Sequence, residues 1–101
     1  MEWERKVEMV ELGNRIDRDK PETKEEFQAF VLGNIDTFDS QSWEMFCEFV
    51  EIVPESMKND IDFWKVVYQR IKKVNFDSMS FRTSLRISLI QTICEDDFNI
   101  K

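Results

Sequence analysis

The sequence predicts an all-α fold, a compact single-domain bundle of four to five helices, from three observations. The 101 residues include only two Gly and two Pro, although tight β-turns need residues that accept a positive φ. Apolar residues recur at spacings of three and four, the period of a helix with one buried face. Nine Phe and three Trp supply large side chains for one core. We therefore expect a single helical domain over 1–101.

Five segments carry this helical period. Each has an apolar stripe, and most have a polar residue before the stripe or a Gly or Pro after it. The predicted helices are 2–12 or 2–18, 23–33, 41–53, 60–74 and 79–95. The third of these is apolar around more than half of its circumference, which is typical of a central helix.

Local signals set some of the helix ends. Thr23 and Glu26 have the spacing of a capping box, in which each side chain accepts from the backbone amide of the other residue. We therefore expect the second helix to begin at Thr23. Gly13 and Gly33, each within a Leu-Gly-Asn tripeptide, are predicted to be C-terminal caps.

The last segment, 79–95, fits two structures. Large apolar residues step by four along it, as on the buried face of a helix: Phe81, Leu85, Leu89 and Ile93. The alternation of Leu85 and Ile87 with polar neighbours would also suit a β-strand. The length of the segment, without a turn residue inside it, favours the helix. The tail after it, 96–101, is predicted to be loose, with Phe98 and Ile100 as the residues that could fasten it.

Missing residue types exclude most catalytic and metal chemistry. The chain has no His, the commonest general base and the commonest metal ligand. Two cysteines, Cys47 and Cys94, do not make a zinc site without further ligands, and we expect both to be reduced and buried. The two isolated glycines cannot form a phosphate-binding loop. We predict no catalytic activity, no cofactor and no metal ion.

The sequence also indicates where the protein works. Its first four residues include two glutamates and lack the apolar segment of a secretion signal. The longest apolar run, 29–32, is far too short to cross a bilayer. We therefore expect a cytoplasmic protein that does not enter membranes.

Charge is distributed unevenly along the chain, whose net charge is −7. Residues 25–64 hold ten acids and one base, whereas 65–94 hold one acid and six bases. Within the third predicted helix and just after it, four acids recur at helical spacing: Glu44, Glu48, Glu51 and Glu55. Like charges at this spacing repel, so helix stability alone would not select them. Further acids are predicted to form the rim of this strip: Asp36, Asp39, Asp60 and Asp62.

Two interpretations of the acidic strip compete. In one, basic residues of the same chain neutralise it: Lys65, Arg70, Lys72, Lys73, Arg82 and Arg86. In the other, the strip faces outward and docks on a basic partner. An acidic surface repels the phosphates of nucleic acids and anionic lipids, so we expect a protein partner instead.

The leading hypothesis is a small inhibitory binding protein, an immunity protein or antitoxin that occludes the active site of a basic toxin such as a nuclease. Its proposed contacts are the strip and the rim. The alternative is a non-catalytic helical adaptor or assembly subunit that binds through an apolar patch around Trp3, Met45 and Ile52. Salt separates the two, because it weakens contacts between charges far more than apolar contacts.

Overall fold

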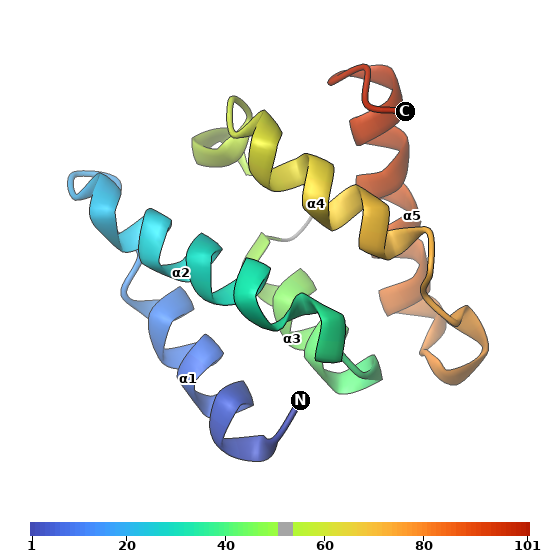
Figure 1. Ribbon diagram of the computed structural model, residues 1–101, viewed down its shortest axis with the longest axis horizontal. Coiled ribbons are helices and arrows are strands. Elements are labelled where there is room, and N and C mark those ends of the chain that lie inside the picture. The colour runs from blue at the N-terminus through green and yellow to red at the C-terminus, as the bar shows by residue number, and fades with distance from the viewer. Residues whose placement is uncertain (51–53) are drawn as a thin grey trace. The chain divides into compact units, whose positions relative to one another are not determined.

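The structure of the protein, a computed structural model, describes residues 1–50 and 54–101. Those residues form five α-helices, so the predicted all-α fold is confirmed (Figure 1). The helices are α1 (Trp3–Asn14), α2 (Pro21–Asn34), α3 (Ser40–Val50), α4 (Ile61–Ile71) and α5 (Phe81–Asp96). Three short 3-10 helices lie between them: η1 (Ile35–Thr37), η2 (Glu55–Met57) and η3 (Phe76–Ser78). The predicted continuation of the third helix over 51–53 lies outside the described residues.

Contacts divide the chain into two compact units, Met1–Phe49 and Val50–Lys101. In the first unit α1 and α2 pack side by side and run in roughly opposite directions (Figure 1). Aromatic rings join α3 to α2, because Phe27 stacks on Phe46 with ring centroids 6.4 Å apart and meets the edge of Phe49 at 5.8 Å. These rings form the centre of the first unit's core.

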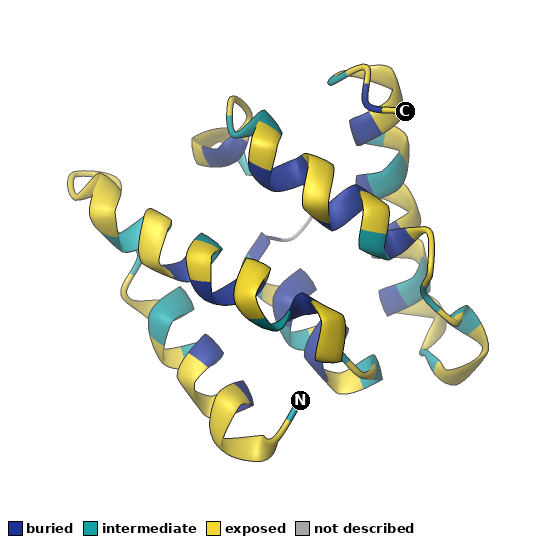
Figure 2. Ribbon diagram, in the orientation of Figure 1, coloured by how far each residue is buried: buried dark blue, intermediate teal, exposed yellow. Residues whose placement is uncertain are grey.

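In the second unit α4 and α5 pack against each other. The fully buried Trp64 donates its indole N–H to the Met57 carbonyl at 2.8 Å, which fastens η2 to α4. The Tyr68 hydroxyl donates to a Glu95 carboxylate oxygen at 2.7 Å and so links α4 to α5. Figure 2 shows the buried positions of α4 as a band along the helix.

Helix α2 begins earlier than the predicted capping box. Pro21 occupies its first turn, where its fixed φ suits a helix and its missing N–H costs nothing. The Thr23 hydroxyl instead donates to the Lys20 carbonyl at 2.7 Å and accepts from the Asp17 amide at 2.8 Å. The predicted box between Thr23 and Glu26 is therefore wrong, because proline starts the helix upstream of it.

The last predicted segment is a helix, α5, as expected, but the side of the helix that is buried is not the predicted one. A continuous helix spans Phe81–Asp96, so the strand alternative is wrong. Its buried residues are Thr83, Ile87, Ile90 and Cys94, whereas the apolar residues predicted to be buried lie on the other side. Ser80 caps the helix by accepting from the Thr83 amide at 3.2 Å.

The C-terminal tail is fastened, in contrast to the predicted loose tail over 96–101. Asp96 still belongs to α5, and Ile100 is buried. The Ile100 amide donates to the Cys94 carbonyl at 2.9 Å, with Asn99 in the left-handed region at φ 54°. Asn is one of the few residues that adopt this conformation readily, so it allows the chain to turn back on the helix.

Both glycines lie inside helices with negative φ, so the predicted C-terminal caps at Gly13 and Gly33 are wrong. They differ in their surroundings. A Cβ on Gly13 would lie 2.6 Å from the Phe49 ring, whereas a Cβ on Gly33 would meet nothing within 4 Å. Gly13 is therefore needed where α1 passes α3, and Gly33 has no such role.

We predict opposite effects of alanine at the two glycines. Gly33→Ala should raise the free energy of unfolding by about 0.5–1 kcal/mol, because alanine loses less backbone entropy in a helix. Gly13→Ala should lower it by about 1 kcal/mol, because overpacking against Phe49 outweighs the same helical gain. Urea denaturation of both variants measures the difference. Equal stabilisation by the two substitutions would contradict the close packing at Gly13.

Candidate functional site

Asp39 starts the helix that carries the predicted acidic strip. Its Oδ1 accepts from the Ser42 amide at 2.9 Å and from the Ser42 hydroxyl at 2.8 Å, so it caps α3 as its side chain predicts. The cap satisfies an amide that the first turn of a helix leaves without a partner. Asp39 thus fixes where α3 begins.

The other oxygen of Asp39 binds a buried cation. The Lys6 ammonium lies 2.8 Å from Asp39 Oδ2 and 2.8 Å from Gln41 Oε1, and Lys6 is only 7% exposed. Desolvation alone would raise the pKa of Asp39, but Lys6 and the Ser42 donors outweigh it and hold that pKa well below its usual range. Asp39 is therefore part of a structural ion pair that joins α1 to α3.

Two residues of the predicted strip share the outward face of α3. Glu44 and Glu48 are both exposed, while Trp43, Phe46 and Cys47 on the other side are buried. Positions four apart lie above one another on a helix, so the two carboxylates form one surface. We call Glu44 and Glu48 the acidic face.

Among the other strip and rim residues that the structure describes, Asp39 caps α3 and the rest lie outside that helix. Glu55 lies in η2, after Pro54, with its carboxylate 3.0 Å from the Lys58 ammonium. Asp60 and Asp62 lie at the start of α4, also in the second unit. Asp36 is exposed in η1 of the first unit, and Glu51 lies outside the described residues. Among the strip residues that the structure describes, Glu44 and Glu48 therefore share one helix face.

The net charge belongs to the first unit. Residues 1–49 hold thirteen acids and six bases, a net of −7, and residues 50–101 hold eight of each, a net of zero. Within 25–49 there are six acids and no Lys or Arg. The six bases proposed as neutralising partners all lie in the second unit. The acidic face thus belongs to the charged half of the protein.

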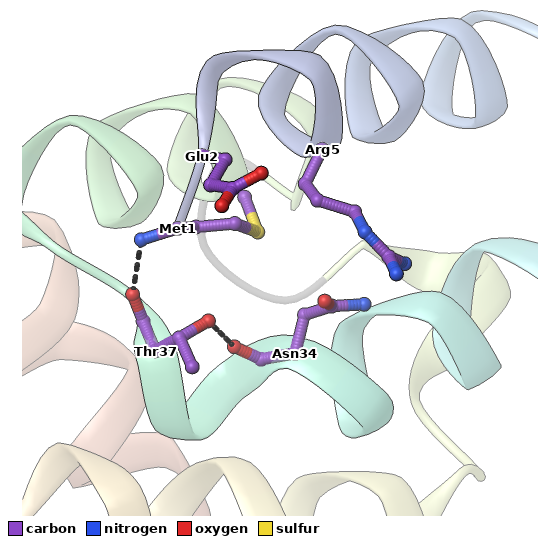
Figure 3. A pocket seen from close by; sticks show the side chains of 5 residues that line it. All are labelled: Met1, Glu2, Arg5, Asn34 and Thr37. Carbon is purple, nitrogen blue, oxygen red and sulfur yellow. Dashed lines mark hydrogen bonds between the residues drawn. The ribbon is translucent and has the colours of Figure 1, made fainter.

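A polar hollow lies beside the N-terminus of α1 (Figure 3). Its lining residues are Met1, Glu2, Arg5, Asn34 and Thr37. The Met1 ammonium donates to the Thr37 carbonyl at 2.6 Å, and the Thr37 hydroxyl donates to the Asn34 carbonyl at 2.8 Å. These contacts fasten the chain's start to the end of α2. The lining offers the Arg5 guanidinium, the Glu2 carboxylate and the Asn34 amide to a ligand.

Other features of the described part of the chain are structural. A second hollow lies in the second unit, between the start of α4 and the end of α5. Cys47 and Cys94 form no disulfide and are buried, as predicted, and burial raises the pKa of the Cys94 thiol to about 11.

In residues 1–50 and 54–101, no three His, Cys, Asp or Glu side chains gather to hold a metal ion. No helix within those ranges is long and apolar enough to cross a bilayer.

Comparisons with protein-family models, with curated proteins and with solved structures found no match for this chain.

The sequence analysis missed an exposed apolar surface on α5. Phe81, Leu85 and Leu89 are 84%, 48% and 39% exposed. Their spacing of four is visible in the sequence, where it predicts the buried face of the helix. A competing stripe of Thr83, Ile87, Ile90 and Cys94 had similar spacing, and only the packing against α4 shows which side is buried.

We predict that the charge of Asp39 stabilises the protein apart from its capping role. Asp39→Asn keeps a capping oxygen but removes the anion from Lys6, and should cost about 2 kcal/mol at neutral pH, less than for a fully buried pair because the Asp39 side chain is 49% exposed. Because the pKa is lowered on folding, the contribution is complete above about pH 4 and is lost as the pH falls below that value. Urea denaturation from pH 7 to pH 2 should show the difference between wild type and variant shrinking.

Glu8→Gln is the matched control, because it removes one exposed carboxylate from α1. It should change stability by less than about 0.5 kcal/mol. If Asp39→Asn behaves in the same way, the ion pair does not stabilise the fold.

Proposed function

We propose that this chain is a non-catalytic binding protein of the cytoplasm that docks on a basic protein partner through its acidic face. The most concrete form of this proposal is an immunity protein or antitoxin. Such a protein would neutralise a basic toxin, for example a nuclease, by occluding its active site.

One observation carries the proposal: α3 exposes Glu44 and Glu48 within a stretch that has no Lys or Arg of its own and one of whose acids, Asp39, pairs with Lys6 of α1. Residues 25–49 contain six acids and no Lys or Arg, and the acidic face of α3 is exposed within this stretch. Glu44 and Glu48 repel each other across one helical turn, which costs a few tenths of a kcal/mol. Cations of a basic partner would attract both carboxylates and so offset their mutual repulsion.

The structure gives this face a rigid base. The opposite side of α3 is packed through Phe46 against Phe27, and the start of the helix is fixed by Asp39. Carboxylates on a rigid helix lose less entropy on binding than carboxylates on a loop. The clefts in which nucleases bind phosphate are basic, so an acidic helix complements them and electrostatic steering would speed association.

Exposed apolar residues of α1 support a second candidate, the helical adaptor. Trp3 is 62% exposed and Val7 is 37% exposed, one turn apart on the same face. Met45 of the predicted patch is half-buried, and Ile52 lies outside the described residues. An adaptor that binds through Trp3 and Val7 would hold its partner at high salt.

We predict that Glu44→Lys/Glu48→Lys abolishes partner recovery in affinity purification with mass spectrometry. The matched control is Glu4→Lys/Glu8→Lys, which makes the same charge change at two exposed positions, one turn apart, on α1 of the same unit. Wild type and control should recover the same basic protein, and the α3 variant should not. Circular dichroism of each variant confirms that the helices are intact.

The purified partner then tests the mechanism. Its affinity should fall at least roughly tenfold between about 50 mM and 500 mM salt, and equimolar wild-type protein should suppress its activity. Equal recovery by wild type and the α3 variant would refute the acidic face. Salt-resistant binding that Trp3→Ala abolishes would establish the adaptor instead.

A further inference from the structure

Helix α5 has two apolar sides, of which one is covered by the second unit. Ile87, Ile90 and Cys94 are fully buried, whereas Phe81, Leu85 and Leu89 face away from them and are exposed. Successive steps of four place these three side chains along one strip of the helix surface. Large apolar side chains that lie together on a surface are typical of an interaction site. We call Phe81, Leu85 and Leu89 the α5 stripe.

Opposite charges stand at the two ends of the α5 stripe. Arg82 lies in the first turn of α5 and Asp96 is its last residue, and both are exposed. On a helical projection Asp96 falls between Leu85 and Leu89, and Arg82 falls about 20° beyond Leu89. A helix dipole favours the reverse order, with acids at the start and bases at the end. Stability of the isolated helix therefore does not account for this arrangement.

We propose that α5 pairs with α5 of a second copy of this chain in antiparallel orientation. With Leu85 of one copy opposite Leu89 of the other, Phe81 lies opposite Ile93 at each end of the contact. Arg82 and Asp96 of the two copies are then offset by four residues, about 6 Å along the axis, which an arginine side chain can span. Two-fold symmetry then forms the Arg82–Asp96 pair at both ends of the contact.

Self-complementarity is what favours a second copy over a different partner. The α5 stripe has a cation at one end and an anion at the other, so a uniformly basic or acidic partner would meet repulsion at one end. Parallel pairing of two copies would place like charges together. The second unit, to which α5 belongs, has no net charge, whereas the first has −7, so a contact through α5 joins two units without net charge.

The expected dimer is weak. The contact spans about 18 Å of helix from Phe81 to Ile93, and a strip of that length and a helix diameter of about 10 Å covers roughly 200 Å². A standard interface buries ~800 Å² on each partner. Association should therefore become visible only at high protein concentration. It does not involve Glu44 or Glu48, so its failure would leave the proposed binding of a basic partner unaffected.

The apolar part of the contact is tested by sedimentation equilibrium between about 10 µM and 1 mM. Wild type should show a monomer–dimer equilibrium. Leu85→Asp should raise the dissociation constant at least roughly tenfold. Val66→Asp, which places the same charge at an exposed apolar position of α4, should leave it within about twofold. A wild type that stays monomeric throughout, or equal effects of the two substitutions, would overturn the proposal.

The charged ends allow a test that does not depend on the apolar residues. Arg82→Asp alone and Asp96→Arg alone should each weaken the dimer, because each creates two repulsive pairs. An equimolar mixture of the two variants should recover wild-type association, because both pairs become attractive in the mixed dimer. The double variant Arg82→Asp/Asp96→Arg should also recover it. A mixture that associates no better than its separate components would refute the antiparallel pairing.

Discussion

The first unit depends on one carboxylate that serves two helices. Asp39 directs one oxygen to the Ser42 amide at the start of α3 and the other to the Lys6 ammonium of α1. A lysine that is 7% exposed requires such a partner, because an ammonium buried without an anion would be costly. The position of α1 and the first turn of α3 are therefore linked, and the acidic face of α3 follows from where that turn begins. The same pair removes Asp39 from the acidic surface to which its sequence position assigned it.

Local chemistry was enough to predict the helices and not enough to predict their faces. Apolar spacing and the scarcity of Gly gave the all-α class, because these features act within one helical turn. Burial of Ile87 in place of Leu89 depends on which side of α5 meets α4, and two stripes of equal spacing cannot decide that. Local sequence does not predict the role of Gly13 either. A side chain is excluded at this position by the ring of Phe49, which lies 36 positions further along the chain. The start of α2 differs, because it depends on local sequence alone. Proline favours the first turn of a helix, and Pro21 begins α2 upstream of the capping box that predicts a start at Thr23.

The candidate site shows the same division between composition and geometry. The excess of acids in the first unit can be counted in the sequence. Glu44 and Glu48 are exposed because the aromatic residues between and beside them are buried on the other side of the helix. Glu55 follows Pro54, at which the predicted third helix ends because proline lacks the N–H of a helix interior, and it lies in η2. The division of the chain after Phe49 separates Asp60 and Asp62 from Asp36, and no composition change marks that boundary. Composition therefore gives the sign of the charge, and only the packing of α3 shows that Glu44 and Glu48 share one exposed face.

The distribution of charge between the units constrains how the protein can associate with itself and with others. A net charge of −7 in the first unit favours approach of basic partners and opposes approach of a second first unit. These effects weaken as salt screens charges separated by more than about 8–10 Å. Contacts on the neutral second unit do not meet this repulsion, and there the α5 stripe combines apolar area with one cation and one anion. A self-contact and a contact with a basic partner can thus use different surfaces and differ in their response to salt, since screening weakens the attraction of a basic partner far more than the apolar part of the α5 contact.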